Sequence, residues 1–233
     1  MANVVVCSDG TWNRPEEDLE QDHPSNVLKL ARGISPDIDD RKQHVFYDWG
    51  LGAYHSSLTA GISGRGIHKN ILDGYRYIVQ NYQAGDRIYL FGFSRGAYTV
   101  RALCELINNC GILQRSHAEL ISRAWQIYKS PRPQNAPSGE AAREFRERYG
   151  HASRSVDFVG VWDTVGALGF PFSVLGFLDA HDEFYDTKMG SNVRIARHAL
   201  AIDEQRRDFE PTLWAPNEGG DLKQVWFAGV HAD

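Results

Sequence analysis

Residues 87–97 read RIYLFGFSRGA, an apolar run that ends in a serine set between two glycines. The aromatic and β-branched residues at its start predict a buried strand, and the segment RGAYTVRALCELINN that follows predicts a helix. The five residues at the junction form the pattern G-x-S-x-G. A strand that turns this tightly into a helix needs glycine on both sides of the turn, because larger side chains would clash there.

Such a turn has a chemical use, because it lifts the serine hydroxyl clear of the sheet. The first turn of the following helix also presents N–H groups and a positive dipole end to an anion formed at that spot. We therefore predict a nucleophile elbow at Gly92, Ser94 and Gly96, with the backbone N–H of Arg95 as one oxyanion donor. The alternative is a turn with a structural role alone.

The rest of the chain alternates between predicted strands and helices. Strands are predicted at 3–7, 44–50, 87–93, 156–163 and 224–230, and helices at 26–34, 67–82, 95–109, 140–149 and 191–203. This order predicts an α/β fold of the α/β-hydrolase type, with a mostly parallel central sheet and helices on both faces. We expect a single domain over residues 1–233, because the Pro-rich stretch 130–139 is typical of a surface loop.

Composition excludes several functional classes. The chain is 42% hydrophobic and 24% charged, and it has no apolar run of membrane-spanning length. A formal charge of -5 without a basic stripe argues against a nucleic-acid partner. The first residues lack the features of a signal peptide, so synthesis in the cytoplasm is expected. Cys7, Cys104 and Cys110 lack CxxC spacing, which predicts buried free thiols.

A serine nucleophile needs a base and a carboxylate that orients it. In α/β hydrolases these residues follow the serine along the chain, at the carboxyl ends of later strands. Asp163 ends the predicted strand VDFVGVWD and His231 follows QVWFAGV, so we predict a triad of Ser94, Asp163 and His231. The alternative for Asp163 is that it simply opens a turn. The other candidates for the acid are Asp179, Asp182 and Asp203. The other candidates for the base are His181 and His198, of which His198 lies on a predicted helix.

A second oxyanion donor is expected from the loop after the first strand, SDGTWN at 8–13. Gly10 or Thr11 would supply its backbone N–H, and the alternative is a simple turn at the end of the strand. A phosphotransfer site of the DGT kind is disfavoured, because Cys7 stands where the nucleophilic aspartate would be expected.

Taken together, these segments resemble an α/β hydrolase family that includes phospholipase effectors of the type VI secretion system. The matching stretches are SDGTWN, GDRIYLFGFSRGAYTVRAL, FVGVWDTVGALG, HALAIDEQRRDFEPTLW and WFAGVHAD. The resemblance implies the same triad, hydrolysis of glycerophospholipid esters, export by that secretion system, and a secretion-apparatus or immunity partner. Family members usually continue past the histidine motif, so a C-terminal truncation is expected of this chain.

We therefore expect a serine esterase or phospholipase that requires no metal or organic cofactor, with calcium at an Asp-rich loop as the exception for a lipid-active member. The Gly- and Phe-rich segment 165–186 predicts an acyl pocket or lid, with transient contact to a membrane surface, or else a core helix. Residues 202–211, IDEQRRDFEP, predict a solvated helix end, or a brace for the histidine loop or a head-group contact. The competing hypothesis is a non-catalytic or truncated hydrolase-fold domain that acts as a binding scaffold.

Overall fold

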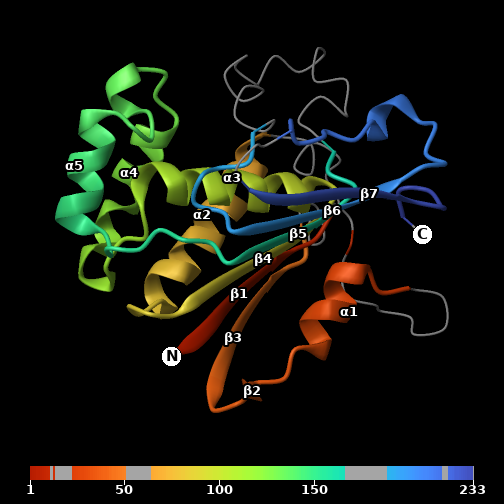
Figure 1. The fold of residues 1–233 in the computed structure, drawn as a ribbon, viewed down its shortest axis with the longest axis horizontal. Helices are drawn as coiled ribbons and strands as arrows, with labels where there is room; N and C mark the ends of the chain where they lie inside the picture. The colour runs from red at the N-terminus through yellow and green to blue at the C-terminus, as the bar shows by residue number, and fades with distance from the viewer. Residues whose placement is uncertain (11–12, 14–22, 51–63, 166–187, 217–219, 233) are drawn as a thin grey trace.

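In the computed structural model of the chain, the described residues are 1–10, 13, 23–50, 64–165, 188–216 and 220–232. Figure 1 shows a sheet whose strands are connected mainly through helices. The strands are β1 Ala2–Ser8, β2 Asp37–Ile38, β3 Arg41–Asp48, β4 Arg87–Phe93, β5 Phe158–Trp162, β6 Ile195–Ala201 and β7 Asp221–Phe227. The α-helices are α1 Asn26–Gly33, α2 Gly64–Asn81, α3 Arg95–Cys110, α4 Ile121–Tyr128 and α5 Glu140–Tyr149, with short 3-10 helices at Arg115–Leu120, Pro133–Asn135 and Arg207–Phe209.

The strands described form one sheet in the order β2-β3-β1-β4-β5-β6-β7. Neighbouring strands are parallel, except that β2 runs antiparallel to β3. The chain leaves β1 for β3 on one side and then returns to β4 on the other side. The carboxyl ends of β1 and β4 therefore flank a topological switch point, where open α/β sheets bind their ligands. The predicted α/β fold is confirmed.

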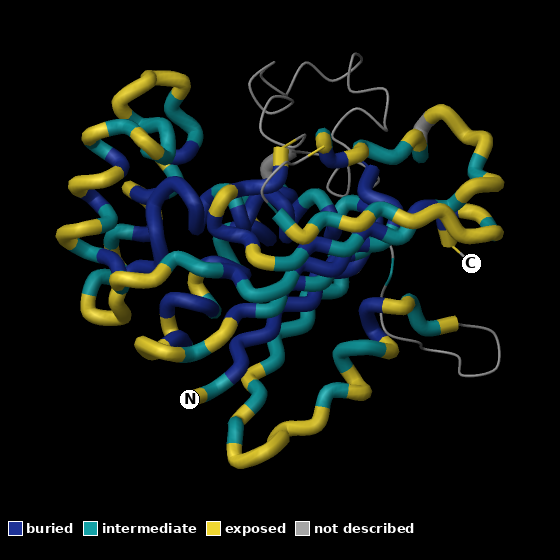
Figure 2. The backbone as a smooth tube through the Cα atoms, viewed as in Figure 1, coloured by how far each residue is buried: buried dark blue, intermediate teal, exposed yellow. Residues whose placement is uncertain are grey.

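Helices cover both faces of this sheet, but unequally. Figure 1 shows α1 on one side and α2, α3, α4 and α5 on the other. Strand β1 divides its side chains between the two sides: Val4 and Val6 pack in the large core with α2 and α3, whereas Val5 and Cys7 pack in a smaller core with α1. Figure 2 shows the consequence, with buried backbone in the centre of the sheet and more exposure toward the outer strand β7.

The predicted apolar face of α2 is confirmed. Tyr75, Ile78 and Val79 are fully buried, and the Tyr75 hydroxyl donates a hydrogen bond to the carbonyl of Gly111 at 2.8 Å. Helices α2 and α3 contact each other, and both pack on the sheet, α2 against β1 and β3 and α3 against β1 and β4. A Cβ on Gly74 of α2 would lie 3.1 Å from Leu103 of α3, so the two helices are close there. The cap predicted for α1 is also present, because the Ser25 side chain accepts a hydrogen bond from the Leu28 N–H.

The helix predicted near 191–203 is wrong, because this segment forms strand β6. The segment contains good helix formers such as Ala199 and Leu200, so local propensity favours a helix. In the fold it lies between β5 and β7 and makes parallel ladders with both, with His198 paired to Val161 on one side and to Gln224 on the other. Burial alternates along β6, as expected for a strand, and tertiary pairing has overridden local preference.

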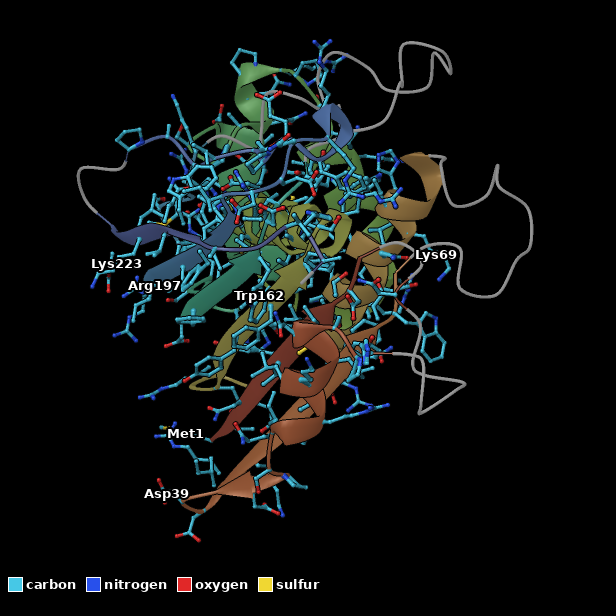
Figure 3. The ribbon with its side chains drawn as sticks, turned by 90° about the vertical axis from the view of Figure 1, so that its right-hand side faces the viewer. Met1, Asp39, Lys69, Trp162, Arg197 and Lys223 are labelled. Atoms are coloured by element: carbon cyan, nitrogen blue, oxygen red, sulfur yellow. The ribbon has the colours of Figure 1, made fainter. Side chains whose placement is uncertain are left out.

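The last predicted strand, 224–230, is shifted by three residues. Strand β7 ends at Phe227, and the chain then turns through Gly229, whose φ is 121°. His231 therefore lies in a loop after the strand and not at the strand end. Figure 3 shows the two margins of the sheet, with Asp39 at the β2–β3 turn on one and Arg197 and Lys223 of β6 and β7 on the other. Trp162, which precedes Asp163, lies between them.

The three cysteines are buried free thiols, as predicted. Burial raises the pKa of Cys7 and of Cys110 to about 12, and it raises that of Cys104 well above its usual range. These side chains fill the core as small apolar groups, Cys7 under α1 and the other two within α3.

The packing of α3 gives a stability prediction. Leu103→Ala should lower the free energy of unfolding by about 2–5 kcal/mol, because it opens a cavity in the main core. Leu213→Ala, at a leucine that is 43% exposed, should cost less than about 1 kcal/mol. Urea melts of both variants at neutral pH measure the difference, and equal losses would contradict the position assigned to α3.

Candidate active site

Ser94 occupies the turn between β4 and α3. Its φ and ψ are 55° and -121°, a region that residues other than glycine rarely adopt. Its N–H donates to the Trp162 carbonyl at 3.0 Å, which ties the turn to the end of β5. The serine side chain is thus held at the carboxyl edge of the sheet by strained backbone, as a nucleophile elbow requires.

The glycines on either side of Ser94 are needed for different contacts. A Cβ on Gly92 would lie 2.5 Å from the carbonyl oxygen of Gly96, inside the turn itself. A Cβ on Gly96 would lie 2.1 Å from the carbonyl oxygen of Ser8, at the end of β1. A side chain at either position would therefore clash, as expected from the sequence. Gly96 also lets α3 approach β1.

The structure brings Ser94, His231 and Asp163 together in one buried chain of hydrogen bonds. His231 Nε2 lies 2.8 Å from Ser94 Oγ, and His231 Nδ1 is hydrogen-bonded to Asp163 Oδ2. A carboxylate can only accept, so Nδ1 carries the proton and Nε2 accepts from the serine hydroxyl. All three residues are buried. An imidazole placed between a hydroxyl and a carboxylate can take the serine proton and have its charge stabilised.

Asp163 is aimed at His231 by an uncommon backbone conformation. Its φ is 39°, in the left-handed region that aspartate tolerates better than most residues. Its N–H donates to the Ala199 carbonyl at 2.8 Å, and its second carboxylate oxygen accepts the Ala201 N–H at 3.2 Å. Asp163 thus both opens a turn and faces the histidine, and its role as a catalytic acid stays a prediction.

The other acid and base candidates lie elsewhere. Asp203 accepts the Gly229 N–H at 2.8 Å, so it supports the loop that carries His231. His198 is buried on β6, and burial, together with the charge of Arg101, lowers its pKa to about 4. Asp179, Asp182 and His181 lie outside the described residues.

The segment IDEQRRDFEP braces the histidine loop, which was the alternative to a solvated helix end. Glu204 accepts the His231 N–H at 3.2 Å, and its side chain is only 4% exposed. Arg206 donates to the same carboxylate through Nε at 2.8 Å and stacks on the ring of Phe209 at 4.2 Å. The Phe209 ring in turn lies 4.5 Å from the His231 ring, with Phe93 at 4.8 Å. The imidazole is thus held by its backbone and by aromatic neighbours.

The loop after β1 is organised by the buried carboxylate of Asp9. This carboxylate accepts hydrogen bonds from the Gly10 N–H at 2.8 Å and the Tyr47 hydroxyl at 2.8 Å, and it also bonds the Ser25 hydroxyl. Burial, and then the charge of Asp9, raise the pKa of Tyr47 above its usual range. The first strand, its loop, the start of α1 and the end of β3 are therefore fixed to one another.

This loop lies against the candidate nucleophile. A Cβ on Gly10 would be 3.3 Å from the Cβ of Ser94. The Gly10 N–H points to Asp9, however, and Thr11 lies outside the described residues, so the choice between them as oxyanion donor stays a prediction. Arg95 begins α3, where first-turn N–H groups point toward the helix start. Burial lowers the pKa of the Arg95 guanidinium to about 10.

Comparison with known proteins assigns the chain. Residues 2–233 match the family model described as "T6SS, Phospholipase effector Tle1-like, catalytic domain". The chain belongs to this family.

Two other proteins are similar to this Tle1-like domain. An uncharacterised protein of Saccharomyces cerevisiae is 26% identical over 237 residues, which cover 92% of the chain and 33% of that protein. The crystal structure of an uncharacterised protein from Pseudomonas aeruginosa matches with a TM-score of 0.56 at 17% identity. The match covers 99% of the chain and 41% of the Pseudomonas aeruginosa protein. The chain thus spans about a third to two fifths of these proteins, and the second comparison supports the fold.

A pocket of about 930 Å³ lies beside His231 of this Tle1-like domain, against α1. Asp163 and His231 form part of its wall, and its other lining residues are mixed in character. Phe93, Trp162, Phe227 and Val230 supply apolar surface, and Asp9, Asn13, His23, Ser25, Asn26 and Lys29 supply polar groups. A substrate with both apolar and polar parts matches such a lining.

No group of three or more metal-ligating side chains gathers in the described ranges of the chain. The segment 165–186, considered as an acyl pocket or lid, lies outside those ranges apart from Val165. None of the helices described is both long and apolar enough to cross a membrane.

The brace at Glu204 gives a pH-dependent prediction. Hydrogen bonds from Arg206 lower the pKa of Glu204 to about 2, from 4.5 for an ordinary glutamate. The folded pKa lies below the unfolded one, so this carboxylate stabilises the fold above about pH 4.5, and the contribution is lost as the pH falls toward 2. Glu204→Gln should therefore lower the urea midpoint at pH 7, and the difference from wild type should shrink between pH 4.5 and pH 3.

The control is Glu210→Gln, at an exposed glutamate nearby. Its midpoint should stay close to that of wild type at each pH. A Glu204→Gln deficit of constant size from pH 7 to pH 3 would show that the ionised carboxylate is not what stabilises the loop.

Proposed function

We propose that the chain is a serine hydrolase that cleaves carboxylic esters, of the lipase or phospholipase type. The observation that carries the proposal is the position of the His231 imidazole, 2.8 Å from Ser94 Oγ and hydrogen-bonded to the Asp163 carboxylate. Membership in a family named for phospholipase effectors supports the lipid class of substrate. The pocket beside His231, with apolar and polar walls, is compatible with an ester that carries an acyl chain.

In the proposed acylation step, His231 Nε2 takes the proton of Ser94 Oγ as that oxygen attacks the ester carbonyl carbon. The ionised Asp163 holds the imidazole and stabilises its protonated form. The negative charge that develops on the carbonyl oxygen is bound by the Arg95 N–H and by an N–H of the Gly10–Thr11 loop. The tetrahedral intermediate collapses when His231 returns its proton to the leaving alcohol, which leaves an acyl group on Ser94.

In the proposed deacylation step, water replaces the serine hydroxyl as the nucleophile. Water gives a proton to His231 Nε2 and attacks the acyl carbon, so that a second tetrahedral intermediate forms in the same oxyanion site. The proton then passes from His231 to Ser94 Oγ, and the carboxylic acid leaves. These steps use groups of the chain itself, and burial of the triad strengthens each charge interaction by lowering the local dielectric.

The family also suggests where such an activity acts. Phospholipids are proposed as substrates, reached by transient contact with a membrane surface. Export by a type VI secretion system and pairing with a secretion or immunity partner are proposed on the same ground. The alternative, a non-catalytic scaffold with the hydrolase fold, offers no reason for a strained serine and a carboxylate to converge on one imidazole.

Reaction with a fluorophosphonate probe tests the nucleophile. Wild type should gain one adduct by intact mass, and Ser94→Ala and His231→Ala should gain none, because each removes a reacting group. Asp163→Asn should slow labelling and ester hydrolysis by about 10³–10⁴-fold, the effect of losing the carboxylate in a triad. Hydrolysis of a short-chain p-nitrophenyl ester and of phosphatidylglycerol vesicles would then compare the two substrate classes.

The matched controls are Ser35→Ala and His44→Ala, both at exposed positions far from Ser94 in the sequence. They should label as wild type does. If folded wild type takes no label at Ser94, the enzyme proposal is wrong and the non-catalytic scaffold replaces it.

A further inference from the structure

His198 is buried in the centre of β6, and the proposed mechanism does not use it. The residue is 2% exposed, and its ring lies next to the Trp214 ring, with centroids 5.6 Å apart. Its Nε2 lies 3.1 Å from the backbone nitrogen of Thr164, the residue after Asp163. Its Nδ1 lies 3.2 Å from the side-chain oxygen of Gln224 on β7. A buried histidine with a defined partner on each nitrogen invites the question of what it holds.

Backbone chemistry fixes the tautomer of this ring. The Trp214 N–H donates to Gln224 Oε1, and the Trp214 carbonyl accepts from Gln224 Nε2, both at 2.9 Å. The amide therefore presents an oxygen to His198, so Nδ1 must carry the proton. The Thr164 N–H can only donate, so His198 Nε2 must accept. Both assignments require the same neutral imidazole, protonated at Nδ1.

The environment keeps the ring neutral. Burial, followed by the charge of Arg101, lowers the pKa of His198 to about 4. Arg101 reaches this region from α3, where its guanidinium stacks on the Trp214 ring at 4.2 Å. A protonated ring would set an Nε2–H against the Thr164 N–H, two donors face to face in a buried site.

The peptide that His198 holds is the one that follows Asp163. Strand β6 grips this turn at three points: the Ala199 carbonyl accepts the Asp163 N–H, the Ala201 N–H donates to the carboxylate, and His198 Nε2 accepts the Thr164 N–H. Asp163 itself has a φ of 39°, which needs support from its surroundings. Of these three contacts, His198 supplies the one made by a side chain of β6, and hence one that a substitution can remove.

We propose that His198 is a positioning residue of the triad: by accepting the Thr164 N–H, it holds the strained turn that aims the Asp163 carboxylate at His231. This inference rests on the proposed function, because it assigns His198 to the geometry of that reaction. His198 does not touch the substrate or exchange a proton. Its removal should therefore lower kcat and leave KM nearly unchanged.

Two variants separate positioning from packing. In His198→Gln the side-chain oxygen reaches about the place of Nε2 and can still accept the Thr164 N–H. In His198→Asn the amide reaches about the place of Nδ1, so the bond to Gln224 is kept and the bond to Thr164 is lost. Both variants leave one buried partner unsatisfied, so their melting temperatures should fall by similar amounts.

The readouts are kcat and KM on a p-nitrophenyl ester and the rate of fluorophosphonate labelling, each per folded molecule. We expect kcat and the labelling rate to be at least tenfold lower in His198→Asn than in His198→Gln, with KM within about twofold. Equal rates in the two variants, with the wild type still labelled at Ser94, would overturn the positioning role and leave the proposed hydrolase intact. A wild type that takes no label would overturn both.

A measurement on the wild-type chain needs no variant to fold. Nitrogen-15 spectra of the histidine rings should show His198 as the neutral tautomer protonated at Nδ1 from pH 7 to pH 5, with Nε2 as an unprotonated acceptor. A ring protonated at Nε2 in this range could not accept the Thr164 N–H, and that result would overturn the proposal on its own.

Discussion

The contact on which the site depends is the approach of the first turn of α3 to the end of β1. With glycine at position 96 the helix lies directly against the Ser8 carbonyl, where any Cβ would be 2.1 Å away. This contact closes the crevice between β1 and β4 enough for Ser94 and the Asp9 loop to lie side by side. The start of α3 and the loop that would complete an oxyanion site are thus brought together by backbone packing, before any charged group takes part.

The positions of Asp163 and of the His231 loop depend on β6 and on the segment that follows it. This strand accepts and donates bonds to the turn at Asp163, and the segment that follows it carries Asp203 and Glu204, which hold the histidine loop at Gly229 and at His231. Asp163 and His231 therefore share one support, although they follow different strands and are 68 residues apart. A change in β6 is expected to act on both together.

The sequence was informative where local chemistry and fold agree. The elbow at Gly92–Gly96 was predictable because its glycines have no substitute, and Asp163 and His231 were predictable as polar residues that follow apolar runs. Strand β6 was not, since Ala, Arg and Leu favour a helix and only pairing with β5 and β7 decides otherwise. The brace at Glu204 was only one of several alternatives for residues 202–211, because a contact across 27 residues leaves no periodic signal. The sequence offered His198 only as an alternative base, because no sequence pattern reveals its contact with the Thr164 N–H.

The buried cysteines have a practical meaning for work on this domain. Cys7, Cys104 and Cys110 are buried in the native fold, and burial raises the pKa of each thiol, so they hold almost no thiolate at neutral pH. An electrophile that reacts with the folded chain is therefore expected to react at residues other than cysteine. The same three groups become reactive once the core opens, so the rate of alkylation serves as a built-in clock for global unfolding.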